Sequence, residues 1–238
     1  MNTTNKAIYW ATVLSACTMG ETAGDFVSFG LKFGYAWASC LLVTLLVIAL
    51  AIEVRAHVPN EARYWTTIVI MSTTGTALAD FLMRTLKLGY ARGSALLITL
   101  FAVIYFIERR RQIDTTMQTR SVPETDAFYW AGILVASTFG TAMGDFVSNV
   151  LGLGFGGGSL LLGGLLAVVL IVEFRAKVSN KPRYWTALVI ASTIGATTGD
   201  FLTKENGLNL GYGWGSAVLI AAFAMVFFIG RCLKLVFE

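Results

Sequence analysis

Charged residues are scarce in this chain, and this scarcity restricts the possible class of protein more than any motif does. Of 238 residues only 13% are Asp, Glu, Lys or Arg, whereas 56% are hydrophobic, and the mean hydropathy is +0.69. An average soluble domain is about one quarter charged. So few charges cannot cover the surface of a globular domain, and the composition therefore predicts a polytopic membrane protein.

Cysteine, proline and histidine are also rare, with three, three and one residues. The three cysteines (Cys17, Cys40 and Cys232) have no paired spacing, which excludes a disulfide-rich secreted class and a Cys-based metal motif. His57 stands beside Arg55 in a polar stretch, so the chain has no His pair for haem and no Ser-His catalytic set. We therefore expect no enzyme, no resident cofactor and no nucleic-acid partner.

A four-copy internal repeat organises the sequence. Each copy opens on a Tyr-Trp pair, and an Asp follows the Tyr at a constant distance. The pairs are Tyr9-Trp10, Tyr64-Trp65, Tyr129-Trp130 and Tyr184-Trp185, and the aspartates are Asp25, Asp80, Asp145 and Asp200. The offsets predict a first half at 1–110 (repeats 8–55 and 63–110) and a second half at 128–238 (repeats 128–175 and 183–232). A polar cytoplasmic connector at 111–127 joins these pseudo-two-fold halves.

Each repeat is long enough for two spans of about 20 residues. The fold class that this predicts is an all-α membrane protein with eight transmembrane helices from four parallel two-helix repeats. We expect the helices over 8–30, 35–55, 63–86, 90–109, 128–151, 155–175, 183–204 and 212–232. Because Lys and Arg concentrate at the termini and between repeats, the positive-inside rule places both termini in the cytoplasm. The lipid bilayer is then a partner, and a homodimer stays open.

On these residues the chain resembles bacterial membrane proteins built from four tandem copies of a two-span repeat of unknown function with a characteristic Trp. The resemblance covers residues 8 to about 232, and its Trp would be Trp10, Trp65, Trp130 and Trp185. It implies eight spans and the bacterial inner membrane, but it brings no activity with it. Amphipathic rings at the ends of spans usually anchor helices in the interface, which is the role we expect for these Trp residues.

Ionisable residues inside spans are costly and usually face the interior of the bundle. The four Asp residues recur at one depth, and Glu21 is an additional acid that the other three repeats lack. Hydroxyl side chains accompany them. These are Thr18, Thr73, Thr138 and Thr193 on the first helix of each repeat, and Ser39, Ser94, Ser159 and Ser216 on the second. Carboxylates and hydroxyls are hard oxygen ligands, which favour divalent cations such as Mg²⁺, Ca²⁺ or Mn²⁺.

The sequence therefore predicts a small inner-membrane transporter. The expected activity is proton-linked export or exchange of a divalent cation at the four Asp residues (the predicted metal ligands), with Glu21 as the coupling proton site. Two alternatives stay open: a proton-coupled carrier of a small organic solute, and a non-transporting scaffold or sensor whose Asp residues cap helices.

Two further expectations are that the Gly-x-x-x-small patterns pack helices together, and that Glu53-Arg55 and Glu173-Arg175 form ion pairs near the loops.

Overall fold

The computed structural model describes residues 3–56, 60–110, 123, 125–175 and 181–237, and these residues form eight α-helices. The first helix of each repeat is α1 (Thr3–Asp25), α3 (Glu61–Asp80), α5 (Ala127–Asp145) or α7 (Lys181–Thr203). The second is α2 (Gly34–Arg55), α4 (Tyr90–Arg110), α6 (Gly154–Arg175) or α8 (Tyr212–Phe237). The all-α architecture of four two-helix repeats is thus confirmed. Most expected bounds agree within a few residues, although α1 begins five residues earlier and α8 ends five residues later than expected.

In three repeats the first helix ends in one π-helical turn. These turns are η1 (Phe26–Gly30), η2 (Phe81–Thr85) and η3 (Phe146–Val150), and each begins directly after the repeated Asp. In the fourth repeat α7 continues to Thr203 without such a turn. Because π-helical turns interrupt the regular ladder and cluster at functional sites, their position marks the Asp residues for attention.

The first helices of the four repeats form a closed inner ring. α1 packs against α3 and α7, and α5 packs against the same two helices. Each second helix lies outside the ring, against the first helix of the following repeat: α2 on α3, α4 on α5, α6 on α7, and α8 on α1. The last repeat therefore closes onto the first, and the bundle has pseudo-four-fold order around the ring axis.

Glycines allow this close contact between neighbouring inner helices. A Cβ at Gly140 would stand 2.7 Å from the Cβ of Ser192, which no real contact tolerates. Four such contacts run around the ring: Gly20 on Ser72, Gly75 on Ser137, Gly140 on Ser192, and Gly195 on Cys17. The expected packing role of these small residues is confirmed.

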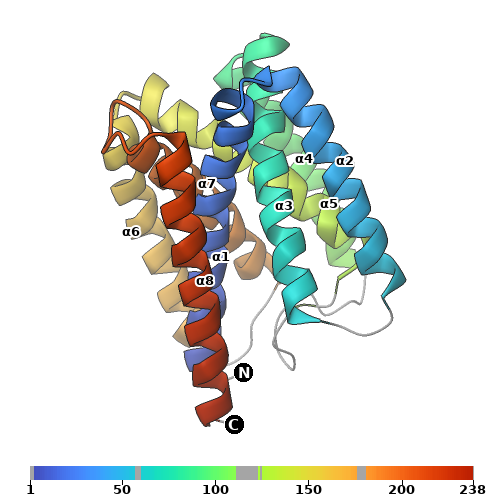
Figure 1. Ribbon diagram of the computed structural model, residues 1–238. Coiled ribbons are helices and arrows are strands. Elements are labelled where there is room, and N and C mark those ends of the chain that lie inside the picture. Colours follow the sequence, from blue (N-terminus) through green and yellow to red (C-terminus); the bar gives the residue numbers. More distant parts are fainter. Residues whose placement is uncertain (1–2, 57–59, 111–122, 124, 176–180, 238) are drawn as a thin grey trace.

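The turn inside each repeat uses left-handed backbone at a fixed place. Gly34, Gly89, Gly154 and Gly211 have φ between 65° and 71°, a region that L side chains rarely adopt. Two residues earlier stand Lys32, Lys87, Gly152 and Asn209, which also have positive φ. Figure 1 places these turns at one end of the bundle and both chain termini at the other. We call these the turn end and the termini end.

The outer helices expose apolar side chains, whereas the inner helices are buried. Six described segments are long and apolar enough to cross a membrane: 34–55, 61–85, 90–110, 127–150, 154–175 and 212–233. Only 11–22% of the residues in the four outer spans are buried, against 67% and 78% in the two inner ones. Because α1 and α7 carry polar stripes, they fall outside this set. A bundle with an apolar outside and a polar inside is what a lipid environment requires.

Candidate cation site

At the termini end, four tyrosine hydroxyls close the ring axis. Tyr9 lies 2.8 Å from both Tyr64 and Tyr184, and Tyr129 lies 2.7 Å from the same two hydroxyls. All four side chains are buried. A hydroxyl has one donor and can also accept, so each tyrosine can donate to one neighbour and accept from the other. We call this closed cycle the tyrosine ring.

The repeated Trp residues surround the tyrosine ring and do not anchor an interface. Trp10, Trp65, Trp130 and Trp185 are only 2–6% exposed, and each packs against the Tyr of the preceding repeat at 5.3–5.8 Å between ring centroids. The expectation of interface anchors was therefore wrong. An indole can serve either role by composition, and the burial here follows from ring closure, which places each Trp between two inner helices.

Ion pairs of the outer helices also lie at the termini end, and of their acids Glu108 and Glu173 are buried and Glu53 is half-buried. Glu53 pairs with Arg63 at 3.2 Å and Glu173 with Arg183 at 2.7 Å, so their partners come from the next helix. The expected ion pairs near the loops are therefore present at Glu53 and Glu173, but their partners are Arg63 and Arg183 and not Arg55 and Arg175, because each acid, two residues before the end of its helix, faces the neighbouring helix. Glu108 pairs in the same way with Lys181 at 3.0 Å.

Toward the turn end, the structure buries five acids at the ends of the inner helices. Asp25, Asp80, Asp145, Asp200 and Glu21 are each between 1% and 4% exposed. We call these five side chains the carboxylate cluster. Ionised carboxylates so far from solvent require cations or protons as partners.

Arg84 supplies one such partner, in η2. Its Nε lies 2.9 Å from Asp80 Oδ1 and its Nη2 3.2 Å from Asp145 Oδ2, so one guanidinium bridges two repeats. Nη1 donates to the Tyr35 hydroxyl at 3.1 Å, and Asn149 donates to the remaining oxygen of Asp145 at 3.2 Å. Both carboxylates are thus held by charge-assisted hydrogen bonds.

Lys204, directly after α7, occupies the corresponding place in the other half. Its ammonium contacts Asp200 at 2.5 Å and Asp25 at 3.2 Å, and it lies 5.5 Å from the centre of the Phe155 ring. One ammonium therefore holds the carboxylates of repeats 4 and 1 together, as Arg84 holds those of repeats 2 and 3.

Glu21 lies inside the ring, against the next two repeats. Its Oε2 accepts hydrogen bonds from Thr76 at 2.9 Å and Thr141 at 2.7 Å, and these residues hold the same place in repeats 2 and 3. The corresponding residue of repeat 4 is Ala196, which is also buried. At this position repeats 2, 3 and 4 carry small side chains, and repeat 1 carries the carboxylate of Glu21.

Three of the carboxylates are close enough to share one ion. One ligand oxygen from each of Glu21, Asp25 and Asp200 lies within 4.8 Å of the others. With an effective dielectric constant of about 20, two ionised carboxylates no more than 4.8 Å apart repel by at least about 3.5 kcal/mol. Bound cations or protons must offset this repulsion.

The predicted hydroxyl ligands are placed differently from the carboxylates. Thr18, Thr73, Thr138 and Thr193 each donate to the carbonyl four residues earlier in their own helix. Ser39 donates to Ala77 O and Ser216 to Thr22 O, so these two serines join an outer helix to the inner helix of the next repeat. The single Ser159 hydroxyl hydrogen has two acceptors within reach, Phe155 O at 2.9 Å and Thr197 Oγ1 at 3.0 Å. Ser94 Oγ is buried and has no hydrogen-bond partner among the described residues.

An open cavity of about 600 Å³ leads from the turn end to the carboxylate cluster. Asp145, Arg84 and Lys204 line it, together with Asn149 and Glu205. We call this cavity the vestibule. It gives water and ions a route to both bridging cations.

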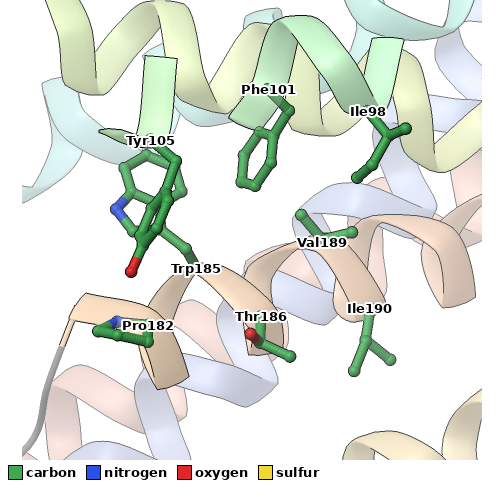
Figure 2. Close-up of a pocket in the computed structure, with 8 residues that line it drawn as sticks. All are labelled: Ile98, Phe101, Tyr105, Pro182, Trp185, Thr186, Val189 and Ile190. Atoms are coloured by element: carbon green, nitrogen blue, oxygen red, sulfur yellow. The ribbon is translucent and has the colours of Figure 1, made fainter. Parts of the chain in front are cut away.

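A second cavity, of about 360 Å³, lies between α4 and α7 and is apolar (Figure 2). Its lining residues are Ile98, Phe101, Tyr105, Pro182, Trp185, Thr186, Val189 and Ile190. These described residues include no acidic or basic side chain, so this groove offers no ligands to a cation.

Sequence reasoning counted Arg84 and Lys204 only as bases of the turns, and so missed their place in the cluster. A signal for them was present, because each follows an Asp by four residues, a spacing that pairs side chains on one helical face. Repeats 1 and 3 carry Phe29 and Asn149 at that position, which gives the cluster a two-fold rather than a four-fold pattern.

The sequence matches a family described as "Repeat of Unknown Function (DUF347)" in four tandem copies, at residues 8–58, 63–114, 128–179 and 183–231. The chain therefore belongs to this family, and the resemblance drawn from the Tyr-Trp repeats is confirmed. No curated protein and no solved structure matches the chain.

Proposed function

We propose that this protein is a small transporter of the bacterial inner membrane that exports or exchanges a divalent cation in a proton-linked manner. The carboxylate cluster would bind the cation. One observation carries the proposal: five buried carboxylates gather around only two cations, Arg84 and Lys204, which line the vestibule together with Asp145, so the cluster retains an excess of acidic groups. Buried acids in excess of their counter-ions typify cation and proton pathways.

The arrangement of polar and apolar surface supports a membrane location with eight spans. The outer helices α2, α4, α6 and α8 present apolar side chains outward, and they enclose the polar inner helices. Thus α1 and α7 would cross the membrane while shielded from lipid. Because Lys and Arg are more frequent at the termini end, that end would face the cytoplasm.

The two ends of the axis differ in a way that suits a carrier. The vestibule opens the cluster at the turn end, whereas the tyrosine ring closes the axis at the termini end. In the proposed cycle, the two halves move against each other, the tyrosine ring opens, and access passes to the cytoplasmic side. Parallel-repeat transporters commonly alternate access by such rocking of halves.

Proton linkage follows from the repulsion within the cluster. When the cation leaves, protons on Glu21 and the nearby Asp residues would relieve the same repulsion that the cation relieved. Release of the cation would then favour binding of protons, and release of protons would favour binding of the cation, which is the basis of exchange.

One observation favours a small organic solute instead. Four aromatic side chains, Phe29, Tyr90, Phe155 and Tyr212, line the vestibule, and aromatic faces bind organic cations. The scaffold alternative is supported by the ion pairs of Arg84 and Lys204, which hold inner helices together.

Reconstituted vesicles distinguish these functions. We would measure Mn²⁺ entry with an interior indicator dye, with and without a pH gradient, for the wild type, Asp25→Asn, and Glu53→Gln as a matched control at the termini end. Gradient-dependent flux that Asp25→Asn abolishes and Glu53→Gln retains is expected. Flux that survives replacement of all four Asp residues by Asn would exclude the cluster as the site. Unfolding of the Asp variants, in place of loss of flux alone, would favour the scaffold.

A further inference from the structure

The two bridging cations of the carboxylate cluster are not equivalent. Arg84 is a planar guanidinium that cannot be deprotonated in proteins, and it makes separate contacts with Asp80, Asp145 and Tyr35. Lys204 is a single ammonium on a flexible four-carbon stem. Both side chains line the vestibule, with Arg84 36% and Lys204 18% exposed, so the difference between them lies in their chemistry and not in their access. A cation that enters through the vestibule can therefore replace Lys204 more readily than Arg84.

The carboxylates on the Lys204 side also have free capacity. Asp25 is 1% exposed, and its Oδ1 has no hydrogen-bond partner among the described residues. In repeat 3 the corresponding Asp145 receives a hydrogen bond from Asn149, but repeat 1 carries Phe29 at that place. A buried carboxylate oxygen without a donor is costly, and a cation ligated by it would remove that cost.

The spacing of this set fits one shared divalent ion. One oxygen from each of Glu21, Asp25 and Asp200 lies within 4.8 Å of the other two. An ion at the centre of three oxygens no more than 4.8 Å apart lies at most about 2.8 Å from each of them, close to the 2.3–2.6 Å of a Ca²⁺–oxygen contact. One divalent cation can therefore contact all three carboxylates.

We propose that the cation site is not four-fold but lies where repeats 4 and 1 meet, at Glu21, Asp25 and Asp200, with Lys204 as a tethered counter-ion that the divalent cation displaces. This rests on the proposed function, whose substrate site it narrows. Arg84, Asp80 and Asp145 form a permanent structural bridge between repeats 2 and 3. The displaced ammonium keeps its charge and moves into the vestibule, where Glu205 also lies. Lys204 is thus a specificity-determining residue. An ion can enter the site only if it binds the three carboxylates more tightly than the ammonium of Lys204 does.

Substitutions at Lys204 test this inference in two opposite directions. Lys204→Met removes the competing charge and keeps an unbranched side chain, so Mn²⁺ should bind the purified full chain at least about tenfold more tightly, because the empty site no longer has to open. Lys204→Arg should bind at least about tenfold more weakly, since a guanidinium bridges two carboxylates as Arg84 does. Free Mn²⁺ measured by electron paramagnetic resonance during a titration gives both affinities.

Matched Asp variants test the asymmetry. Asp25→Asn should weaken Mn²⁺ binding by about 100-fold, whereas Asp80→Asn, at the same position of repeat 2, should change it by less than about threefold while lowering thermal stability. Equal loss in the two variants would overturn the inference in favour of a symmetric site. Unchanged Mn²⁺ affinity in both Lys204 variants would also overturn it.

The failure of this inference is distinguishable from failure of the proposed function. If Mn²⁺ enters vesicles but its affinity is the same in the Lys204 variants as in the wild type, the transport function is supported and the role of Lys204 as a displaced counter-ion is excluded. If Mn²⁺ binds tightly and its affinity changes in the Lys204 variants as stated, but no flux is measured, the cation site is supported and the transport function is excluded. If Lys204→Met fails to fold, the direction of the Lys204→Arg effect decides the inference alone.

Discussion

The tyrosine ring allows a prediction whose magnitude follows from counting hydrogen bonds. Each hydroxyl takes part in two of the four bonds, so a single Tyr→Phe substitution breaks two. Replacing the adjacent pair Tyr9 and Tyr64 breaks three bonds, because one bond is shared. Replacing the opposite pair Tyr9 and Tyr129 breaks all four and leaves two buried hydroxyls without partners.

Hydrogen bonds in soluble proteins contribute about 1 kcal/mol each, and those between membrane helices about 0.6 kcal/mol. We therefore expect a loss of about 1–2 kcal/mol for each single variant, about 2–3 kcal/mol for the adjacent pair and about 2.5–4 kcal/mol for the opposite pair. The order of the two double variants is the diagnostic result, because each removes the same number of hydroxyls.

Unfolding in mixed micelles of rising SDS fraction, followed by tryptophan fluorescence, measures these differences. Tyr105→Phe is the matched control, since Tyr105 lies in the apolar groove and outside the ring. It should change the free energy of unfolding by less than about 0.5 kcal/mol. Equal destabilisation by the adjacent and opposite pairs, or a single variant as stable as the wild type, would refute the closed cycle.

Three further substitutions test the packing and the burial of side chains. Gly140→Ala places a Cβ against Ser192 and should destabilise the fold by about 1–3 kcal/mol, whereas Gly164→Ala on the open face of α6 should be neutral or stabilising, as melting curves of the two variants would show. Ser39→Ala should cost about 1 kcal/mol through its lost bond to Ala77, but Ser94→Ala should cost nothing; equal costs would mean that Ser94 has a partner. Replacing the exposed Trp37 and Trp214 by Phe leaves four buried indoles, so brominated lipids should no longer quench the fluorescence; residual quenching would mean that the repeated Trp residues face lipid after all.

Much of this fold can be predicted from the sequence because the same residue pattern occurs in four copies. The spacing from Tyr9 to Asp25, copied three times, predicts the length of each first helix, and the long apolar run after each turn predicts the second helix. The glycine patterns predict close helix contacts. These are local properties of each repeat, and the structure agrees with them.

The order in which repeats meet is not a local property. Nothing near Asp25 or Asp200 indicates that the first and last repeats are neighbours, because their contact depends on closure of the ring through Gly195 and Cys17. The burial of the Trp residues depends on the same closure. Glu21 was recognisable as the departure from symmetry, but its hydrogen bonds to Thr76 and Thr141 arise only when three repeats converge.

The central claim is that the carboxylate cluster carries a divalent cation across the membrane, and tracer counterflow tests it most directly. Vesicles with the reconstituted full chain would be loaded with unlabelled Mn²⁺, diluted into medium with trace radioactive Mn²⁺, and followed in time beside vesicles with Asp25→Asn. The account predicts a transient accumulation of tracer above equilibrium for the wild type and none for the variant. Tracer that never exceeds equilibrium in vesicles with folded wild-type protein would contradict it.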